Sequence, residues 1–339
     1  MPLSAAPAHP AFARYTRGVL AFNVAVVLWA AYVRASGSGA GCGRHWPACN
    51  GRVVPLLQST KEMVEFAHRI SSGLALLLVV GMLVWALRRL PAGHPARGGA
   101  IASMVLMVME ALLGAGLVLL RLVENDASKL RAISMAAHLT NTLFLLGAIT
   151  LTCWWAAGGA RIRLRGNGRR VAIVAPALAA TVVVAVSGAV TALGDTLFPA
   201  GSLAAGLRQD LSPTAHFLIR LRILHPAFAI ATGVLVVFTG YAVRRARTGA
   251  ATARLSRVLV ALFFAQLAAG AVNVVLLAPT AMQILHLLLA DCVWIALVLT
   301  AASALSEDAA PAAGGAGSPA AEAAATPARS LPSEAGLVG

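Results

Sequence analysis

Eight long apolar runs are the feature that most restricts how this sequence can fold. Each is close to or above the roughly 20 residues that a helix needs to cross a bilayer. Only 12% of the residues are charged, whereas a soluble domain carries about 25%. The mean hydropathy of +0.81 agrees with this difference. We therefore predict an all-α integral membrane protein whose transmembrane helices lie at about 17–34, 68–87, 100–121, 133–155, 171–193, 222–243, 256–277 and 281–304.

The arginines are distributed unevenly along a chain whose net charge is +15. One set of alternate loops is rich in arginine, and the other set mixes basic with acidic residues. The positive-inside rule assigns the mixed loops to the outer face of the membrane. This pattern predicts a protein of the cell (inner or cytoplasmic) membrane with both termini cytoplasmic, rather than one that binds nucleic acid. Fifteen arginines occupy the N-terminus and alternate loops: Arg14, Arg17, Arg88, Arg89, Arg97, Arg161, Arg163, Arg165, Arg169, Arg170, Arg244, Arg245, Arg247, Arg254 and Arg257.

The runs divide the chain into four predicted parts. Residues 1–16 form a cytoplasmic segment, residues 17–160 a first four-helix half, and residues 161–304 a second four-helix half. Residues 305–339 are rich in Ala, Pro, Gly and Ser, a composition that cannot bury a core, and we expect a disordered tail. The first run lacks a small-residue cleavage pattern, so we expect it to remain as a helix.

Four histidines lie near the starts of every second apolar run: His68, His138, His225 and His286. If the runs are membrane helices, these starts share the outer leaflet. Two helical histidines that face each other across a bundle can supply both axial ligands of a haem iron, so two pairs would make two sites. A single histidine on an apolar helix is more often a hydrogen-bonded residue between helices. Four at matching positions favour ligation.

Other residues repeat with the histidines. The third run contains Glu110 and Gly114, and the seventh contains Gln266 and Gly270, with the same spacing of four. The first and second histidines of each half are 70 residues apart in one half and 61 in the other. This similarity predicts a pseudo-repeat of two four-helix bundles.

The two halves differ beside their first histidines. Glu65 stands three residues before His68, on the same helix face, whereas Arg222 stands three residues before His225. A carboxylate beside a haem can accept a proton or orient water, while an arginine there can pair only with a propionate or a similar anion. We infer that the first half is the reactive one. The alternative for Glu65 is a solvated loop residue paired with Lys61 or Arg69.

The loop after the first run contains two cysteines on the side where disulfides can form. Six residues, with Gly and Pro among them, separate Cys42 from Cys49 and allow them to be joined. The bond could be a structural link or a redox-active disulfide, and both interpretations stay open. A zinc site that includes His45 is less favoured because only three ligands are in view. We expect Cys153 and Cys292, within helices, to pack as small apolar residues.

These motifs together resemble haem A synthases of the CtaA/Cox15 family, over about residues 15–304. The resemblance implies eight transmembrane helices in two four-helix halves. It also implies an oxidoreductase that oxidises a ring methyl of haem O to the formyl group of haem A, through an alcohol and a hydrated aldehyde, for cytochrome oxidase assembly. The matching features are the glycine-rich loop Gly37–Gly51 with Cys-x6-Cys and Trp46-Pro47, the motif Glu65-x-x-His68-Arg69, and the four histidines.

The resemblance also implies roles for the matched residues. His68 and His138 would bind the iron of the substrate haem O, and Glu65 would be catalytic, as proton acceptor or water-positioning residue. His225 and His286 would be the axial ligands of a haem b cofactor. Cys42 and Cys49 would take part in delivering reducing equivalents or in haem handling. Candidate contacts for the haem propionates are Arg34, Arg69, Arg121 and Arg222.

Some positions depart from the family pattern or keep open roles. Pro226 follows His225 where an arginine is common, and His216 stands nine residues upstream as a competing ligand, although we expect it in a surface loop. Residues 194–221 lack the second cysteine pair that some relatives have. Glu110 and Asp291 are acids within membrane runs, with a functional role and interhelical hydrogen bonding equally open.

The implied partners are haem O synthase (protohaem farnesyltransferase), cytochrome oxidase assembly factors, a membrane electron donor and the lipid bilayer, with homo-oligomerisation left open. Two alternatives use the same four histidines. A di-haem b-type electron-transfer cytochrome would not need Glu65 or the cysteine loop. A haem transporter or chaperone would need an exchangeable haem at one pair and no oxidant.

Overall fold

The computed structural model describes residues 9–56, 58–246 and 249–306, and within them the regular secondary structure is entirely helical, apart from two isolated β-bridges. Ten helices follow one another along these residues. They are α1 (Pro10–Ala35), α2 (Thr60–Arg89), α3 (Pro95–Leu119), α4 (Lys129–Ala156), α5 (Gly168–Leu197), α6 (Leu203–Leu211), α7 (Phe217–Arg222), α8 (Leu224–Ala246), α9 (Ala250–Val275) and α10 (Thr280–Leu305).

Eight segments are long and apolar enough to cross a membrane, and they confirm the eight predicted runs. The short α7 continues into α8 to make one of these spans, Phe217–Ala246. Helix α6 was not predicted, because its nine residues are short and carry charges. The predicted all-α membrane fold is therefore confirmed.

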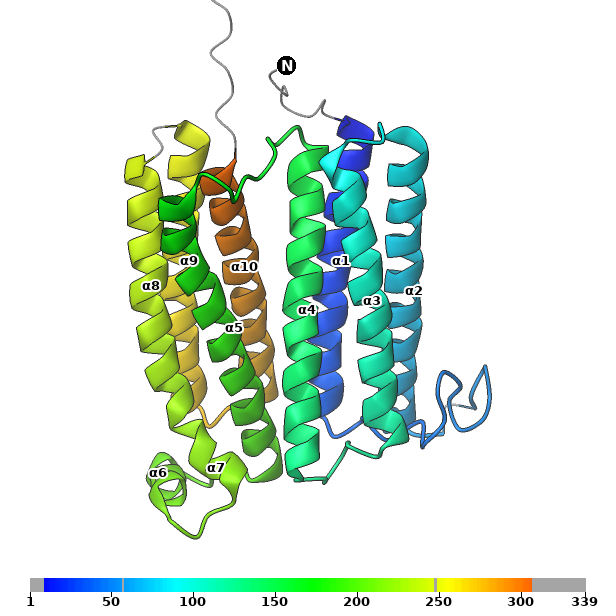
Figure 1. Ribbon diagram of the computed structural model, residues 1–339. Coiled ribbons are helices and arrows are strands. Elements are labelled where there is room, and N and C mark those ends of the chain that lie inside the picture. The colour runs from blue at the N-terminus through cyan, green and yellow to red at the C-terminus, as the bar shows by residue number, and fades with distance from the viewer. Residues whose placement is uncertain (1–8, 57, 247–248, 307–339) are drawn as a thin grey trace, which may run out of the picture.

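The spans pack as two neighbouring groups of four (Figure 1). In the first group α1 contacts α2 and α4, and α3 contacts α2 and α4. In the second group α5 contacts α8 and α10, and α9 contacts α8 and α10. The groups meet where α4 packs against α5 and α10, and α1 against α10. Consequently α4 and α10 are the most buried spans.

Hydrogen bonds from the side chains of Trp294 and Arg34 join the two groups. The indole of Trp294 on α10 donates a hydrogen bond of 2.7 Å to the backbone carbonyl of Leu143 on α4, within a small apolar cluster. Nearer the other end, the guanidinium of Arg34 on α1 donates to Thr196 on α5 and to Gln283 on α10. In each of these hydrogen bonds the donor belongs to one group and the acceptor to the other. They therefore help to fix the relative position of the two groups.

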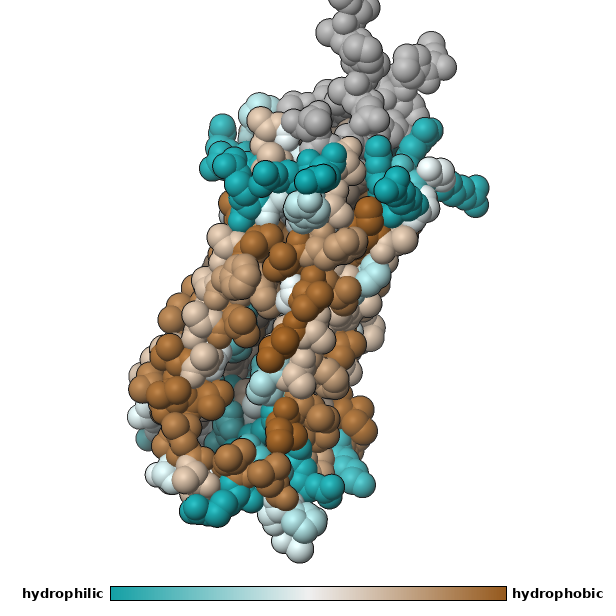
Figure 2. Space-filling model, turned by 90° about the vertical axis from the view of Figure 1, so that its left-hand side faces the viewer, coloured by the Kyte–Doolittle hydropathy of each residue, from teal (hydrophilic) through white to brown (hydrophobic). Residues whose placement is uncertain are grey.

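The surface shows the division expected of a membrane protein. Apolar side chains form the middle of the face in Figure 2, and hydrophilic side chains gather at both ends. The described ends of α2, α4 and α8 that carry arginine-rich loops lie at the same end of the bundle as the start of α1 (Figure 1). The starts of α2, α4, α8 and α10, which bear the four histidines, lie at the opposite end.

Several helices begin earlier than their apolar runs. Helix α1 begins at Pro10 rather than at residue 17, because proline is suited to a first turn. Helix α2 begins at Thr60 rather than at residue 68, since the side chain of Ser59 accepts a hydrogen bond from the Glu62 amide and caps it. Part of the predicted 1–16 segment is therefore helical. Most of the predicted tail and residues 1–8 lie outside the described residues.

Candidate functional site

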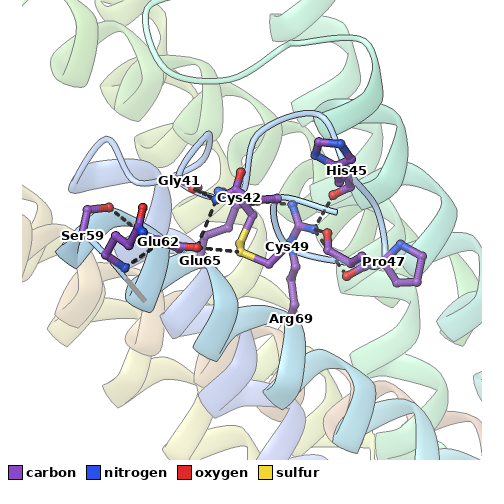
Figure 3. Close-up of a disulfide and its surroundings, with 12 residues drawn as sticks. Gly41, Cys42, His45, Pro47, Cys49, Ser59, Glu62, Glu65 and Arg69 are labelled. Atoms are coloured by element: carbon purple, nitrogen blue, oxygen red, sulfur yellow. Dashed lines mark hydrogen bonds and ion pairs between the residues drawn. A yellow bond between two sulfur atoms is a disulfide. The ribbon is translucent and has the colours of Figure 1, made fainter. Parts of the chain in front are cut away.

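The loop between α1 and α2 is closed by a disulfide between Cys42 and Cys49, and both cysteines are fully buried (Figure 3). The disulfide predicted from the sequence is therefore present, so neither sulfur is a thiolate available to zinc. The loop rests directly on the first turn of α2. A Cβ added at Gly41 would lie 2.4 Å from the backbone carbonyl of Lys61, so only glycine fits there.

Glu65 lies under this loop, on α2, with only 3% of its surface exposed. One carboxylate oxygen, Oε2, accepts a hydrogen bond of 2.8 Å from the backbone amide of Cys42. The other oxygen, Oε1, accepts from the guanidinium of Arg69, one helical turn further on. Glu65 is therefore a buried helical carboxylate and not the solvated loop residue of the alternative interpretation. Each oxygen keeps one lone pair for a further donor.

Arg69 links α2 to the loop. Besides Glu65, its guanidinium donates to the backbone carbonyls of His45 and Ala48 (Figure 3). A second buried carboxylate, Glu62, accepts from Asn50 at 3.0 Å and from the Gln58 amide at 2.8 Å. The sequence analysis missed Glu62, although its position in a capping-box pattern after Ser59 was a usable signal.

The first pair of histidines comes from α2 and α4. His68 and His138 are both half-buried. The Nδ1 nitrogen of His68 is buried without a hydrogen-bond partner among the described residues. Nδ1 of His138 donates to Glu110 on α3 at 3.0 Å, and its Nε2 lies beside Gly114, where an added Cβ would be 3.4 Å away.

The second pair comes from α8 and α10. The ring centres of His225 and His286 are 6.3 Å apart, with the rings nearly perpendicular. Each ring lies against a glycine, and a Cβ added at Gly188 or Gly270 would come within 2.9 Å of His225 or His286. Glycine at these two positions therefore leaves space beside both imidazole rings that a larger residue would fill.

Neutral groups contact these two rings. The Ser187 hydroxyl shares a hydrogen bond of 2.9 Å with Nδ1 of His225. The amide nitrogen of Gln266 lies 3.3 Å from Nε2 of His286, whose Nδ1 is buried without a partner among the described residues. Ser187 was missed by the sequence analysis, because a single serine on an apolar helix carries no distinctive pattern.

The two pairs suit axial ligation of a haem iron better than binding of a metal ion by protein alone. In the described ranges no three His, Cys, Asp or Glu side chains form a cluster that could bind a metal ion. The spacing of 6.3 Å between the ring centres of His225 and His286 would allow both imidazoles to bind one haem iron. Among the described residues the buried Nδ1 atoms of His68 and His286 have no partner, and glycines lie beside three of the rings; both features are compatible with haem binding.

The four candidate propionate arginines differ in their surroundings. Arg69 contacts Glu65 and the loop, and Arg34 joins the two helical groups. Arg222 forms ion pairs with Asp195 at 3.0 Å and with Asp210 at 2.7 Å. Arg121 is exposed in the loop after α3. Three of the four guanidinium groups thus have protein partners that a propionate would have to replace or share.

The remaining candidates have ordinary surroundings, with one exception. His216 caps α7, where its Nδ1 accepts from the Leu218 amide, so it lies in the connection between α6 and α7. Cys153 and Cys292 are half-buried free cysteines within helices. Asp291 is the exception: it is 1% exposed, and within the described part of the chain its Oδ2 has no hydrogen-bond partner.

The fold and the site define a helical membrane protein that spans the bilayer several times and carries two histidine pairs at one end. The chain belongs to the COX15-CtaA family, described as cytochrome oxidase assembly protein, whose sequence model matches residues 13–298. This match confirms the family resemblance drawn from the motifs.

Individual relatives carry two different names. Over 303 residues the chain is 51% identical to a protoheme IX farnesyltransferase of Thermus thermophilus, covering 89% of this chain and 50% of that protein. It is 40% identical over 93 residues to a heme A synthase of Shouchella clausii, covering 27% of this chain and 31% of that protein. It is 28% identical over 119 residues to a heme A synthase of Exiguobacterium, covering 35% of this chain and 39% of that protein. The chain spans about half the length of the Thermus relatives.

Proposed function

We propose that this protein is a haem A synthase, an oxidoreductase that converts a ring methyl of haem O into the formyl group of haem A. The observation that carries the proposal is the buried Glu65 carboxylate, positioned by the disulfide loop one turn before His68. Membership of the cytochrome oxidase assembly family and the relatives named heme A synthase support it.

The two histidine pairs divide the work in this proposal. His68 and His138 bind the substrate haem O, and His225 and His286 bind a haem b cofactor. When bound, haem b supplies reversible one-electron chemistry. The spacing of His225 and His286 and the glycines beside their rings support the cofactor assignment.

Glu65 handles protons in the proposed reaction. Oxidation of a methyl group to an alcohol and then to a hydrated aldehyde releases protons, and a basic group near the reacting carbon lowers the barrier. The Cys42 amide and Arg69 stabilise the carboxylate charge. They leave a lone pair on each oxygen to orient a water or accept a proton. Arg69 therefore acts on the substrate site through Glu65 and the loop.

The source of haem O is proposed to be a protohaem farnesyltransferase in the same membrane. The Thermus relatives bear that name and are about twice as long as the segment that matches this chain. Cytochrome oxidase assembly factors would receive the product, as the family description suggests. Because oxidation of the methyl carbon releases electrons together with protons, the proposed reaction also needs a redox partner in the membrane that accepts them.

We also propose that the histidine end of the bundle faces the outside of the cell membrane. The arginine-rich loops gather at the other end, as the positive-inside rule requires of cytoplasmic loops. After reduction that breaks the disulfide and opens the loop, a thiol reagent that cannot cross the membrane should label Cys42 and Cys49 in intact cells. Cys153 and Cys292 lie within membrane spans and serve as internal controls that stay unlabelled. Labelling only in inverted vesicles would contradict this orientation.

Extracted haems test the function directly. The protein should be co-expressed with a protohaem IX farnesyltransferase in a host that makes no haem A, with the farnesyltransferase alone as control. We expect haem A only when both proteins are present. Haem O without any haem A or alcohol would contradict the proposal and favour an electron-transfer cytochrome or a haem chaperone. Exchange of the haem at His68 and His138 with added haem would then distinguish these two alternatives, because only the haem chaperone requires it.

A further inference from the structure

Three side chains from α4 converge on one carboxylate of α3, beside the first histidine pair. Glu110 Oε1 accepts from His138 Nδ1 at 3.0 Å and from the Thr142 hydroxyl at 2.5 Å. Its Oε2 accepts from the Asn141 amide at 2.6 Å. Asn141 and Thr142 lie three and four residues after His138, so one face of α4 supplies all three donors. This network fixes the carboxylate and, through it, the imidazole.

The corresponding histidine of the second half has no acidic partner at this position. Gln266 occupies the place that Glu110 has in the pattern of spacings, and it contacts His286 through a neutral amide at the other ring nitrogen. His225 is contacted by the neutral hydroxyl of Ser187. Of the four histidines, His138 is therefore the one whose ring is paired with a carboxylate among the described residues.

We propose that Glu110 is a positioning residue that makes His138 a stronger ligand of the substrate haem than either histidine of the second pair is of its haem. This inference rests on the proposed function. A carboxylate that accepts from Nδ1–H fixes the tautomer, directs Nε2 to the metal and raises the basicity of the ligating nitrogen. Gly114 presents no side chain to Nε2 of His138, which would lie 3.4 Å from a Cβ added there.

A more basic ligand stabilises the oxidised iron relative to the reduced iron. The haem at His68 and His138 is thus expected to have a lower midpoint potential than the same haem would have with a neutral partner at His138. This difference assigns the two halves different redox roles although both use two histidines. A purely structural role for Glu110, tying α3 to α4 through Asn141, would leave the potential unchanged.

The test is a redox titration of the purified protein, with haem b in place and haem O added, comparing wild type with Glu110→Gln. We expect the midpoint potential of the added haem O to rise in the variant and that of haem b to stay unchanged. Retention of haem O should also weaken by about 10–100-fold, the usual effect of losing such a partner. The matched control, Ser187→Ala, should alter only the haem b signal.

Glu110→Asp keeps the charge but moves the carboxylate oxygen away from His138, so it should raise the midpoint potential of haem O by a smaller amount. This variant also allows the test if Glu110→Gln yields little protein. Unchanged haem O potential in both Glu110 variants, with wild type binding two haems, would overturn this inference and leave the proposed function intact. Failure of wild type to bind haem O at all would overturn the proposed function itself.

Discussion

At the histidine-bearing ends of the two four-helix groups, opposite charges precede the first histidines. In the first group a carboxylate, Glu65, lies under the disulfide loop and is contacted by a backbone amide and by Arg69. In the second group the equivalent position is Arg222 on α7, which forms ion pairs with Asp195 on α5 and with Asp210 on α6. A histidine pair is thus combined with a buried carboxylate in one half and with an ion-pair network in the other.

Under the proposed function, this difference separates the substrate site in the first half from the cofactor site in the second. The second site has only neutral hydrogen-bond partners at its histidines among the described residues, and its nearby aspartates are paired with Arg222. The first site has two acids, Glu65 before His68 and Glu110 against His138. We therefore assign proton chemistry to the first half, and the following variants test that assignment.

Glu65→Gln should cause the largest change. It keeps the size of the side chain but removes the basic carboxylate, so haem A formation should fall by about 10²–10⁴-fold while haem b remains bound. The matched control is Glu62→Gln, since Glu62 is similarly buried on the same helix but contacts only loop residues. Haem extraction after co-expression gives both yields. Equal losses in the two variants, or a normal yield from Glu65→Gln, would return Glu65 to a structural role.

Arg222→Gln should destabilise the second half without altering the first. Removing one partner of a buried ion pair costs about 3–5 kcal/mol. That is an upper bound here, because each aspartate side chain is 22% exposed. We expect a lower melting temperature and loss of haem b before haem O on heating. Arg220→Gln, an exposed neighbour on α7, is the control. A melting temperature equal to that of the control would show that the network contributes nothing measurable.

Gly41→Ala should have a smaller effect, confined to the first half. The new Cβ would meet the backbone of Lys61 and Glu62, so the loop must move away from α2 at a cost on the order of 1–3 kcal/mol. The Cys42 amide would then leave Glu65. Gly39→Ala is the matched control, because its Cβ would make only ordinary contact with Val123 at 3.5 Å. Thiol alkylation should detect more reduced Cys42 and Cys49 in Gly41→Ala than in Gly39→Ala. Equal alkylation of the two variants would contradict the close packing of the loop on α2.

Features that depend on patterns over long stretches of the sequence were predicted correctly. Eight apolar runs and four matching histidines were sufficient for the fold class and for the location of the candidate sites. The helix starts were missed because capping by Ser59 and the first-turn Pro10 act outside the apolar runs. Helix α6 was missed because nine partly charged residues resemble a loop.

Partners within the sites were predicted only when they lie one helical turn apart. The spacing of four residues indicated that Arg69 could pair with Glu65, whereas Lys61 pairs with Glu124 at 3.6 Å instead. Contacts between distant segments were not predictable. The Cys42 amide on Glu65, the Ser187 hydroxyl on His225 and the two aspartates around Arg222 each depend on tertiary packing.

The haem spectra of four single variants test most directly whether the two histidine pairs do different work. His225→Ala and His286→Ala should each lose the tightly bound low-spin haem b. His68→Ala and His138→Ala should each retain that haem b signal and form no haem A. Loss of one and the same haem signal from all four variants would contradict the assignment of cofactor to one half and substrate to the other.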